Sequence, residues 1–403
     1  MGEIQFPDGF LIGASTAAHQ IEGGNVNSTW WMFEHREGTP IEEPSGDAAD
    51  SYHRWPDDLD LVADLGLDAY RFSVEWARIE PERGFVSKAA LQHYRRMIDG
   101  ALERGIEPAV TLHHFTEPRW FWEAGGWCAA DATESFVRYV TAVAPILEGV
   151  RWVVTINETN IASIMARLTR PMEAAERLAE QERDVPGAPL PSPHSGTVAG
   201  MTAAHHAACE ALHPLLENTC LGWSVASQVI QSVPGGEDAA ARYEELVEDV
   251  FLRESRHDDF VGVQSYTRNV FGPDGPVRDD PDDTRTQMGW EYWPDALGHA
   301  VRHTAEVTGG VPILVTENGI ATADDERRID YTSGALRSLR SAMDDGVDVR
   351  GYLHWSLLDN YEWGSYRPTF GLASWDSETF DRTPKPSARW LGEVARSPRS
   401  ASR

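Results

Sequence analysis

The chain has 403 residues and carries 64 acidic against 35 basic side chains, which gives a formal net charge of −29. Only two of the basic residues are lysines, Lys88 and Lys385. Because no basic stripe is present to neutralise phosphates, nucleic acid is not an expected partner. An acidic, lysine-poor surface repels itself in dilute buffer and stays hydrated in concentrated salt. We therefore expect a halophilic protein; an ordinary acidic cytosolic enzyme is the alternative.

The cysteines and the first residues of the chain indicate the expected cellular compartment. Cys128, Cys209 and Cys220 are too few and too widely spaced for a disulfide framework or a zinc site. No apolar run is long enough to span a bilayer. The first residues lack the basic start and the long apolar core of a signal peptide. We therefore expect a cytoplasmic protein with no membrane partner, and the sequence leaves its oligomeric state open.

Short apolar runs alternate with helical patterns from one end of the chain to the other. Helical patterns include 87–104 and 134–148. Strand followed by helix-bearing sequence, repeated eight times, predicts an α/β fold with a single (β/α)8 TIM barrel over residues 1–395. No Gly-rich nucleotide fingerprint or P-loop follows a strand, which weakens an open nucleotide-binding sheet. The predicted strands are 10–16, 69–75, 107–114, 151–157, 220–226, 260–266, 312–316 and 350–356.

Three stretches interrupt this alternation. Residues 184–196 have a loop-like composition and follow a charged helix predicted at 171–183. Residues 272–289 form a Pro-, Asp- and Gly-rich excursion after the sixth strand. The tail, 396–403, is predicted to be disordered. None of these stretches is long enough to be a second domain.

Two glutamates stand where a buried apolar strand gives way to a loop. Glu158 follows the fourth predicted strand and Glu317 follows the seventh, each with an asparagine beside it. A carboxylate in such a place is costly unless it has a partner or a task. Strands four and seven are three places apart on a ring of eight, so the two side chains can face each other across the mouth. Paired carboxylates perform acid/base and nucleophilic chemistry on glycosidic bonds; a structural ion pair is the alternative.

The other predicted mouth positions are rich in groups that bind hydroxyls and in tryptophans whose faces stack on sugars. Some of these tryptophans serve as barrel filling instead. Adjacent strand residues point to opposite faces, so His113 and His114 cannot bind one metal ion. His205 and His206 lie in a helical pattern without an acidic partner at ligand spacing and are expected to pack or face solvent. The hydroxyl-binding group is Gln20, His114, Asn157, Tyr266, Asn318 and Glu362, and the tryptophans are Trp120, Trp122, Trp290, Trp293, Trp355 and Trp363.

Together with these residues, a series of short motifs makes the chain resemble glycoside hydrolase family 1, the retaining β-glucosidases and β-galactosidases. The resemblance covers about 360 residues in family order, and its specificity comes from the whole series of short motifs. Those motifs are 10–23, Asp50-Ser-Tyr-His-Arg54, Tyr70-Arg71-Phe72-Ser73, Thr111-Leu-His-His114, Asn157-Glu158, Met288-Gly289-Trp290, Thr316-Glu317-Asn318-Gly319 and 355–363.

The resemblance implies a role for each matching residue. Glu317 is the implied nucleophile and Glu158 the acid/base. Arg71, Tyr266 and Asn157 are implied to support the nucleophile. The implied substrate-binding residues are Gln20, His114, Asn157, Trp290, Trp355, Glu362 and Trp363, with Trp290 on the leaving-group sugar and Glu362 on the 4- and 6-hydroxyls.

The chain also departs from the family pattern. Thr159 stands where proline usually follows the acid/base, and Gln264 brings one more methylene than the usual asparagine. Phe115 replaces a tryptophan and Thr369 an arginine, and the chain is shortened mainly between 160 and 200. None of these changes removes a carboxylate, so they bear on substrate preference.

The sequence thus predicts a retaining β-glycosidase that needs neither cofactor nor metal. Its expected substrates are small β-glycosides: β-linked glucose or galactose at the non-reducing end of oligosaccharides, or aryl and alkyl glycosides. The same glycosyl-enzyme can pass its sugar to an acceptor other than water, so a transglycosylase of the same family is the nearest alternative. A non-catalytic sugar-binding barrel would have lost a carboxylate. A 6-phospho-glycosidase is disfavoured because Glu362 would repel the phosphate.

Overall fold

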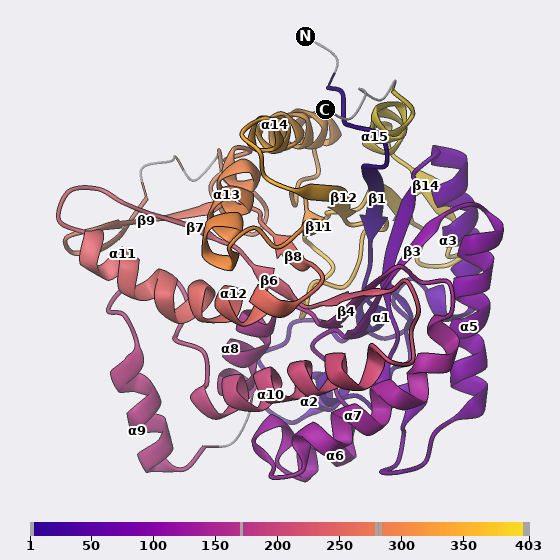
Figure 1. Ribbon diagram of the computed structural model, residues 1–403, viewed down its shortest axis with the longest axis horizontal. Helices are drawn as coiled ribbons and strands as arrows, with labels where there is room; N and C mark the ends of the chain where they lie inside the picture. The colour runs from indigo at the N-terminus through magenta and orange to yellow at the C-terminus, as the bar shows by residue number, and fades with distance from the viewer. Residues whose placement is uncertain (1–3, 170–171, 279–280, 282–283, 398–403) are drawn as a thin grey trace.

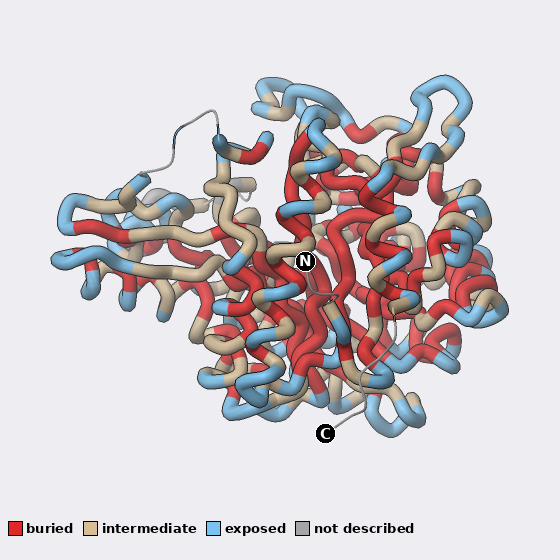
Figure 2. Tube along the Cα trace, turned by 90° about the horizontal axis from the view of Figure 1, so that it is seen from above, coloured by how far each residue is buried: buried red, intermediate tan, exposed pale blue. Residues whose placement is uncertain are grey.

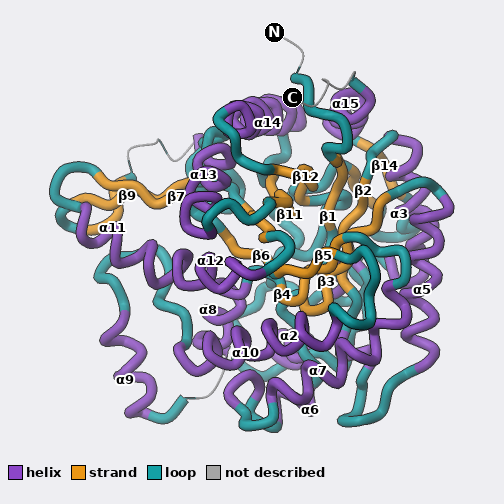
Figure 3. The backbone as a smooth tube through the Cα atoms, viewed as in Figure 1, coloured by secondary structure: helices purple, strands orange, loops and turns teal. Residues whose placement is uncertain are grey.

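The computed structural model describes residues 4–169, 172–278, 281 and 284–397. Its main sheet has nine strands in the order β5-β4-β3-β2-β1-β12-β11-β8-β6, and every pairing within it is parallel. Helices surround these strands (Figure 3). The strands are β1 (Leu11–Ser15), β2 (Ala69–Ser73), β3 (Glu107–His113), β4 (Trp152–Ile156), β5 (Cys220–Gly222), β6 (Ser224–Ala226), β8 (Val261–Gln264), β11 (Ile313–Asn318) and β12 (Val349–Trp355).

The two ends of this strand order are neighbours in the chain. β5 pairs with β4, β6 pairs with β8, and only Trp223 separates β5 from β6. The fifth predicted strand, 220–226, therefore supplies both ends, and the sheet closes on itself. Trp223 interrupts it with a fully buried indole that donates to Ser255 Oγ at 2.6 Å. The predicted (β/α)8 barrel is confirmed.

The apolar strand sequences follow from burial on both faces. Every residue of β2 and β4 is buried, as expected for parallel strands enclosed by helices. Viewed from above, buried segments fill the centre and exposed ones form the outer rim (Figure 2). The neighbouring strands β1 and β2 lie very close together at Gly13, because a Cβ there would meet the carbonyl oxygen of Ala69 at 2.1 Å.

The helices of the outer layer match the predicted patterns within a few residues. The pattern at 87–104 is α5, which begins after Ser87, whose side chain accepts from the Ala90 N–H. The pattern at 134–148 is α7 followed by a 3-10 turn at Ala144–Leu147, which starts where Pro145 removes a backbone donor. The outer helices are α3 (Ser51–Leu65), α5 (Lys88–Glu103), α7 (Ala132–Val143), α8 (Thr159–Thr169), α10 (Ser195–Leu212), α11 (Glu237–Glu244), α12 (Val250–Glu254), α13 (Ala296–Thr308), α14 (Asp325–Asp344) and α15 (Pro386–Arg396).

The loops beyond the carboxyl ends of the strands carry further short elements. These ends point away from the side of the barrel that carries α14 and α15 (Figure 1). α1 (Ala18–Ile21), α2 (Thr29–His35), α4 (Trp76–Ile79) and α6 (Arg119–Glu123) belong to these loops, and β13 (Ala373–Trp375) pairs with β14 (Arg382–Pro384) near the end of the chain.

The excursion predicted at 272–289 is partly regular structure. β7 (Val229–Ser232), β9 (Arg268–Gly272) and β10 (Gly275–Val277) form a small sheet that projects beside α11 (Figure 1). Of these strands only β10 lies wholly within the predicted excursion, where its Gly-Pro-Val sequence hid it. Residues 279–280 and 282–283 of the same stretch lie outside the described residues.

Two other predicted element boundaries differ from those in the structure. The charged helix predicted at 171–183 is α9 (Ala174–Arg183), with 170–171 outside the described residues, and α10 already begins at Ser195 within the predicted loop. The predicted tail started inside α15, because Arg396 ends that helix and its guanidinium donates to the Leu65 carbonyl. Residues 398–403 are outside the described part of the chain. Within the described residues, no helix is both long and apolar enough to cross a membrane.

Candidate active site

Glu158 and Glu317 line one cavity of about 620 Å³ at the carboxyl ends of the strands. β4 ends at Ile156, and Glu158 follows with a left-handed backbone (φ +40°). That conformation is uncommon for a residue with a Cβ and is found at functional turns. The Glu158 N–H donates to Ser224 Oγ at 3.1 Å, which ties this turn to β6. The strained turn directs the glutamate away from the strand and into the cavity.

Glu317, within β11 and only 4% exposed, is held by three donors. Arg71 Nη1 donates to Oε1 at 2.6 Å and Gln264 Nε2 donates to the same oxygen at 2.9 Å. Tyr266 OH donates to Oε2 at 2.7 Å. The register of β11 against β8 shifts between Val315 and Glu317, an irregularity of the kind that re-aims a side chain beside active sites. Charge-assisted bonds of this kind favour the ionised carboxylate.

Asn157 connects this carboxylate to the neighbouring strands. Its Oδ1 accepts from Arg71 Nη2, from Gln264 Nε2 at 2.7 Å and from Ser224 Oγ at 3.1 Å. Its amide nitrogen must then be the donor toward His114 Nε2, 3.3 Å away, which leaves the His114 proton on Nδ1. Burial and the Arg71 charge hold the pKa of His114 well below its ordinary value, so the ring is neutral.

The two carboxyl groups differ in their affinity for a proton. Burial and the charge of Glu317 raise the pKa of Glu158 well above its ordinary value. Burial also raises the pKa of Glu317, but Arg71, Tyr266 and Gln264 act in the opposite direction. Among the described residues, no side chain donates to the Glu158 carboxyl in the way that three do to Glu317. A single proton shared by the pair therefore resides on Glu158.

The remaining predicted sugar contacts surround the same cavity. Gln20 Nε2 donates to Asn360 Oδ1 at 3.1 Å and to the Tyr361 carbonyl at 2.8 Å, while its buried Oε1 has no hydrogen-bond partner among the described residues. The ring of His114 is nearly parallel to those of Trp355 and Trp363, with centroids 5.9 and 6.2 Å away. These groups present unused hydrogen-bonding atoms and flat ring faces to a ligand.

Glu362 is a third carboxyl group lining the cavity. Trp355 Nε1 donates to its Oε1 at 3.1 Å. Burial raises the pKa of Glu362 to about 8, although the bond from Trp355 opposes this shift. A carboxyl that is partly protonated near neutral pH can both donate to and accept from hydroxyl groups.

The structure brings most of the sequence-predicted site residues to this one cavity. Gln20, His114, Tyr266, Trp290, Trp355, Glu362 and Trp363 line it together with both catalytic candidates. Arg71 and Asn157 lie beneath the lining, where they hold Glu317 and its neighbours.

Several other predicted positions lie elsewhere. Trp120 donates to the Glu80 carbonyl, and Trp293 packs against Arg268. His205 is buried and stacks on Trp223, and the side chain of His206 is largely exposed, so one packs and the other faces solvent as expected; their acidic partners come from another segment. Asp258 and Glu254, distant in the sequence, lie 3.0 and 3.2 Å from the two histidines.

Sequence reasoning missed Ser224, which joins Asn157 to the Glu158 backbone, and Thr111, which accepts from Arg71 Nε at 3.0 Å. Ser224 follows the interruption of the fifth strand at Trp223, and nothing in its local sequence marks it.

One cavity thus holds a carboxylate kept ionised by donors and a carboxyl kept protonated by burial and that charge, among groups that bind hydroxyls. This combination defines a glycoside hydrolase. The sequence profile of "Glycosyl hydrolase family 1" matches residues 2–229 and 241–399. The chain belongs to this family. The protein is an O-glycosyl hydrolase, a retaining β-glycosidase.

Individual relatives agree with this assignment. The chain is similar to Beta-glucosidase A of Thermotoga maritima, with 30% identity over 452 residues that cover 98% of this chain and 99% of the relative. Thermostable beta-glucosidase B of Thermobispora bispora is 32% identical, covering 98% and 91%. The crystal structure of beta-glycosidase BGL167 superposes with a TM-score of 0.88 at 43% identity, covering 99% of each chain. A beta-glycosidase from Pyrococcus horikoshii gives 0.86 at 34%, covering 98% and 96%.

Proposed function

We propose that Glu317 is the nucleophile and Glu158 the acid/base of this β-glycosidase. Glu317 attacks the anomeric carbon of the sugar, the glycosidic C–O bond breaks, and Glu158 gives its proton to the departing oxygen. Formation of the ester removes the negative charge of Glu317, so the pKa of Glu158 falls and Glu158 takes a proton from water. That water then attacks the anomeric carbon and releases Glu317. The observation that carries these roles is the set of three donors on Glu317.

Arg71, Tyr266 and Asn157 act through Glu317 in this proposal. Arg71 and Tyr266 keep the carboxylate ionised and aimed, and Asn157 orients Arg71 and Gln264. Gln264 supplies a further donor at 2.9 Å, so the longer amide at this position still reaches the nucleophile. No step requires a metal ion or a cofactor.

The proposed substrates are β-glucosides and β-galactosides. Two relatives are named beta-glucosidases, and one from Bifidobacterium breve is named a bifunctional beta-D-glucosidase/beta-D-fucosidase. Glu362 and Gln20 line the cavity with unused capacity for hydroxyls, and Trp363 and Trp355 offer ring faces. A panel of nitrophenyl β-glycosides in dilute and in molar salt tests this range. Cleavage of neither glucoside nor galactoside contradicts it.

The two glutamate roles are separable by chemical rescue. Glu317→Gly should lose turnover, and azide should restore it by forming the α-glycosyl azide, since azide then attacks the anomeric carbon of the bound glycoside from the side of the missing nucleophile and displaces the aglycone. Glu158→Ala should still form the ester with activated leaving groups, and azide should then give the β-glycosyl azide. Unactivated alkyl glycosides should suffer most in Glu158→Ala, because only they need protonation. Exchanged azide products would reverse the two assignments.

The acidic surface suggests the setting in which the enzyme works. With a net charge of −29 and two lysines, the fold is proposed to be adapted to a salt-rich cytoplasm. The catalytic barrel is proposed to be one unit over residues 1–395.

A further inference from the structure

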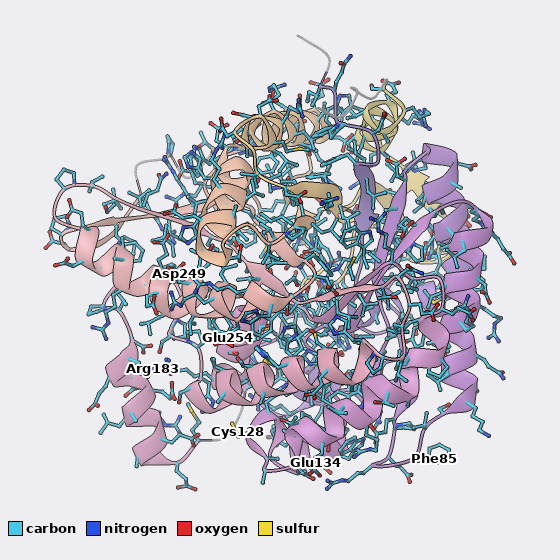
Figure 4. All side chains as sticks on the ribbon, in the orientation of Figure 1. Phe85, Cys128, Glu134, Arg183, Asp249 and Glu254 are labelled. Atoms are coloured by element: carbon cyan, nitrogen blue, oxygen red, sulfur yellow. The ribbon has the colours of Figure 1, made fainter. Side chains whose placement is uncertain are left out.

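A second cavity, of about 300 Å³, adjoins the active-site cavity. We call it the side chamber. The two cavities have Trp30, Phe115 and Met165 in common in their linings. Most of the other lining residues come from α2, α6, α8 and the turn that follows α6. This turn includes the exposed residue Cys128, which lies on the side of the molecule that carries α6 and α10 (Figure 4). The two cavities are therefore neighbours.

The walls of the side chamber are suited to an apolar group. Phe33, Phe121 and Trp127 line it and are 9%, 2% and 5% exposed. The main polar groups of the lining are already engaged. Glu117 accepts from Trp127 Nε1 at 2.8 Å and from Thr29 Oγ1 at 2.9 Å. The Arg36 guanidinium lies 4.1 Å from the centre of the Phe33 ring. A sugar would find few hydrogen-bond partners in this chamber, whereas a hydrocarbon chain is favoured there because its surface is removed from water.

The side chamber also borders the helix that follows Glu158. α8 begins directly after Glu158, and the Ala162 N–H donates to the Glu158 carbonyl at 2.8 Å. Ala162, Met165, Ala166 and Thr169 of this helix follow one another along the chamber wall. The acid must lie beside the oxygen that it protonates, so the aglycone leaves the cavity on the side of Glu158 and α8. Only Met165 of these four also lines the active-site cavity.

We propose that the side chamber binds the apolar part of the aglycone, with an unbranched alkyl chain as its ligand. The inference rests on the proposed role of Glu158 as the acid. The chain leaves the sugar beside Glu158, passes Met165 and Trp30, and extends along α8 toward Thr169. The enzyme then prefers alkyl β-glycosides whose chains are long enough to reach the chamber.

The first test is the dependence of kcat/KM on chain length for methyl, butyl, hexyl and octyl β-glucosides. Each methylene that moves from water into the chamber should raise kcat/KM about fourfold until the chamber is full. Ala166→Trp should remove most of this increase in kcat/KM. In Thr169→Phe the increase should continue to a longer chain than in Ala166→Trp before it stops. Ala124→Trp is the matched control, because Ala124 is an exposed residue after α6 that is not part of the lining.

The readout is the ratio of kcat/KM for the octyl over the methyl glucoside, which cancels a general loss of activity. A wild-type ratio near one, or a high ratio that survives both filling variants, overturns the inference. If the filling variants change the sedimentation of the protein but leave this ratio unchanged, the inference is also overturned, and the chamber is then an interface between copies of the chain.

A second measurement separates the chamber from the catalytic proposal. The Kd values of octyl and methyl β-thioglucosides, which resist hydrolysis, should show the same chain-length preference and the same loss in Ala166→Trp. Tighter binding of the octyl compound without cleavage of either glucoside would remove the proposed catalytic roles and leave the chamber supported. Equal binding of the two thioglucosides overturns the chamber.

Discussion

The hydroxyl of Tyr266 is expected to set the acid limb of the pH–rate profile. It donates to Glu317 Oε2 at 2.7 Å, opposing the burial that raises the pKa of that carboxyl. A hydrogen bond to a charged group contributes about 1.5–3 kcal/mol, and about 1.36 kcal/mol corresponds to one pKa unit. Tyr266→Phe should therefore raise the pKa of Glu317 further. Because the ionised form is the proposed nucleophile, the acid limb should move to a higher pH, by about 1–2 pH units.

The assay is kcat/KM against pH with a nitrophenyl β-glucoside, whose good leaving group makes protonation by Glu158 less important. The acid limb belongs to the carboxyl pair, in which Glu158 keeps its proton while Glu317 loses its own. Tyr331→Phe is the matched control, since the Tyr331 hydroxyl donates to the Tyr266 carbonyl at 2.6 Å and not to a carboxylate. An acid limb that stays in place in Tyr266→Phe, or that moves equally in Tyr331→Phe, would refute the reasoning.

Four further predictions concern the carboxyl separation, the effect of salt, and the sugar, which has two. A crystal structure should place the carboxyl groups of Glu158 and Glu317 about 5–5.5 Å apart, whereas roughly 6.5–9.5 Å would indicate inversion. Melting temperature should rise from dilute buffer to molar KCl, where the Debye length falls to about 3 Å; no change would remove the halophile proposal. Glu362→Ala should slow glucosides more than fucosides, which lack the 6-hydroxyl, as shown by kcat/KM for both; equal losses would mean that Glu362 does not contact this end. Wild type should reject 6-phosphoglucosides in the same assay above about pH 8, where Glu362 is ionised and like charges in a partly dry pocket cost several kcal/mol, and a preference for them would contradict this.

The sequence by itself determined the barrel and the proposed catalytic pair. Eight apolar runs with helical patterns between them leave few ways to bury each strand on both faces, so the closed parallel sheet follows from periodicity. Glu158 and Glu317 are visible because a charged residue at the end of an apolar strand is a local contrast. The pairing of Arg71 with Glu317 was accessible only through the resemblance, since their positions are 246 residues apart.

The tertiary structure decided what depends on contacts between distant segments. Asp258 is the partner of His205 because α10 packs beside the segment after α12. The residue spacing within either segment does not predict this contact. Ser224 reaches Asn157 and Glu158 because Trp223 breaks the fifth strand, which places the serine on β6 instead of β5. The side chamber exists because α2, α6 and α8 meet without filling the space between them. Side-chain packing between helices sets such a volume, and a linear pattern of apolar residues looks the same whether the space is filled or empty.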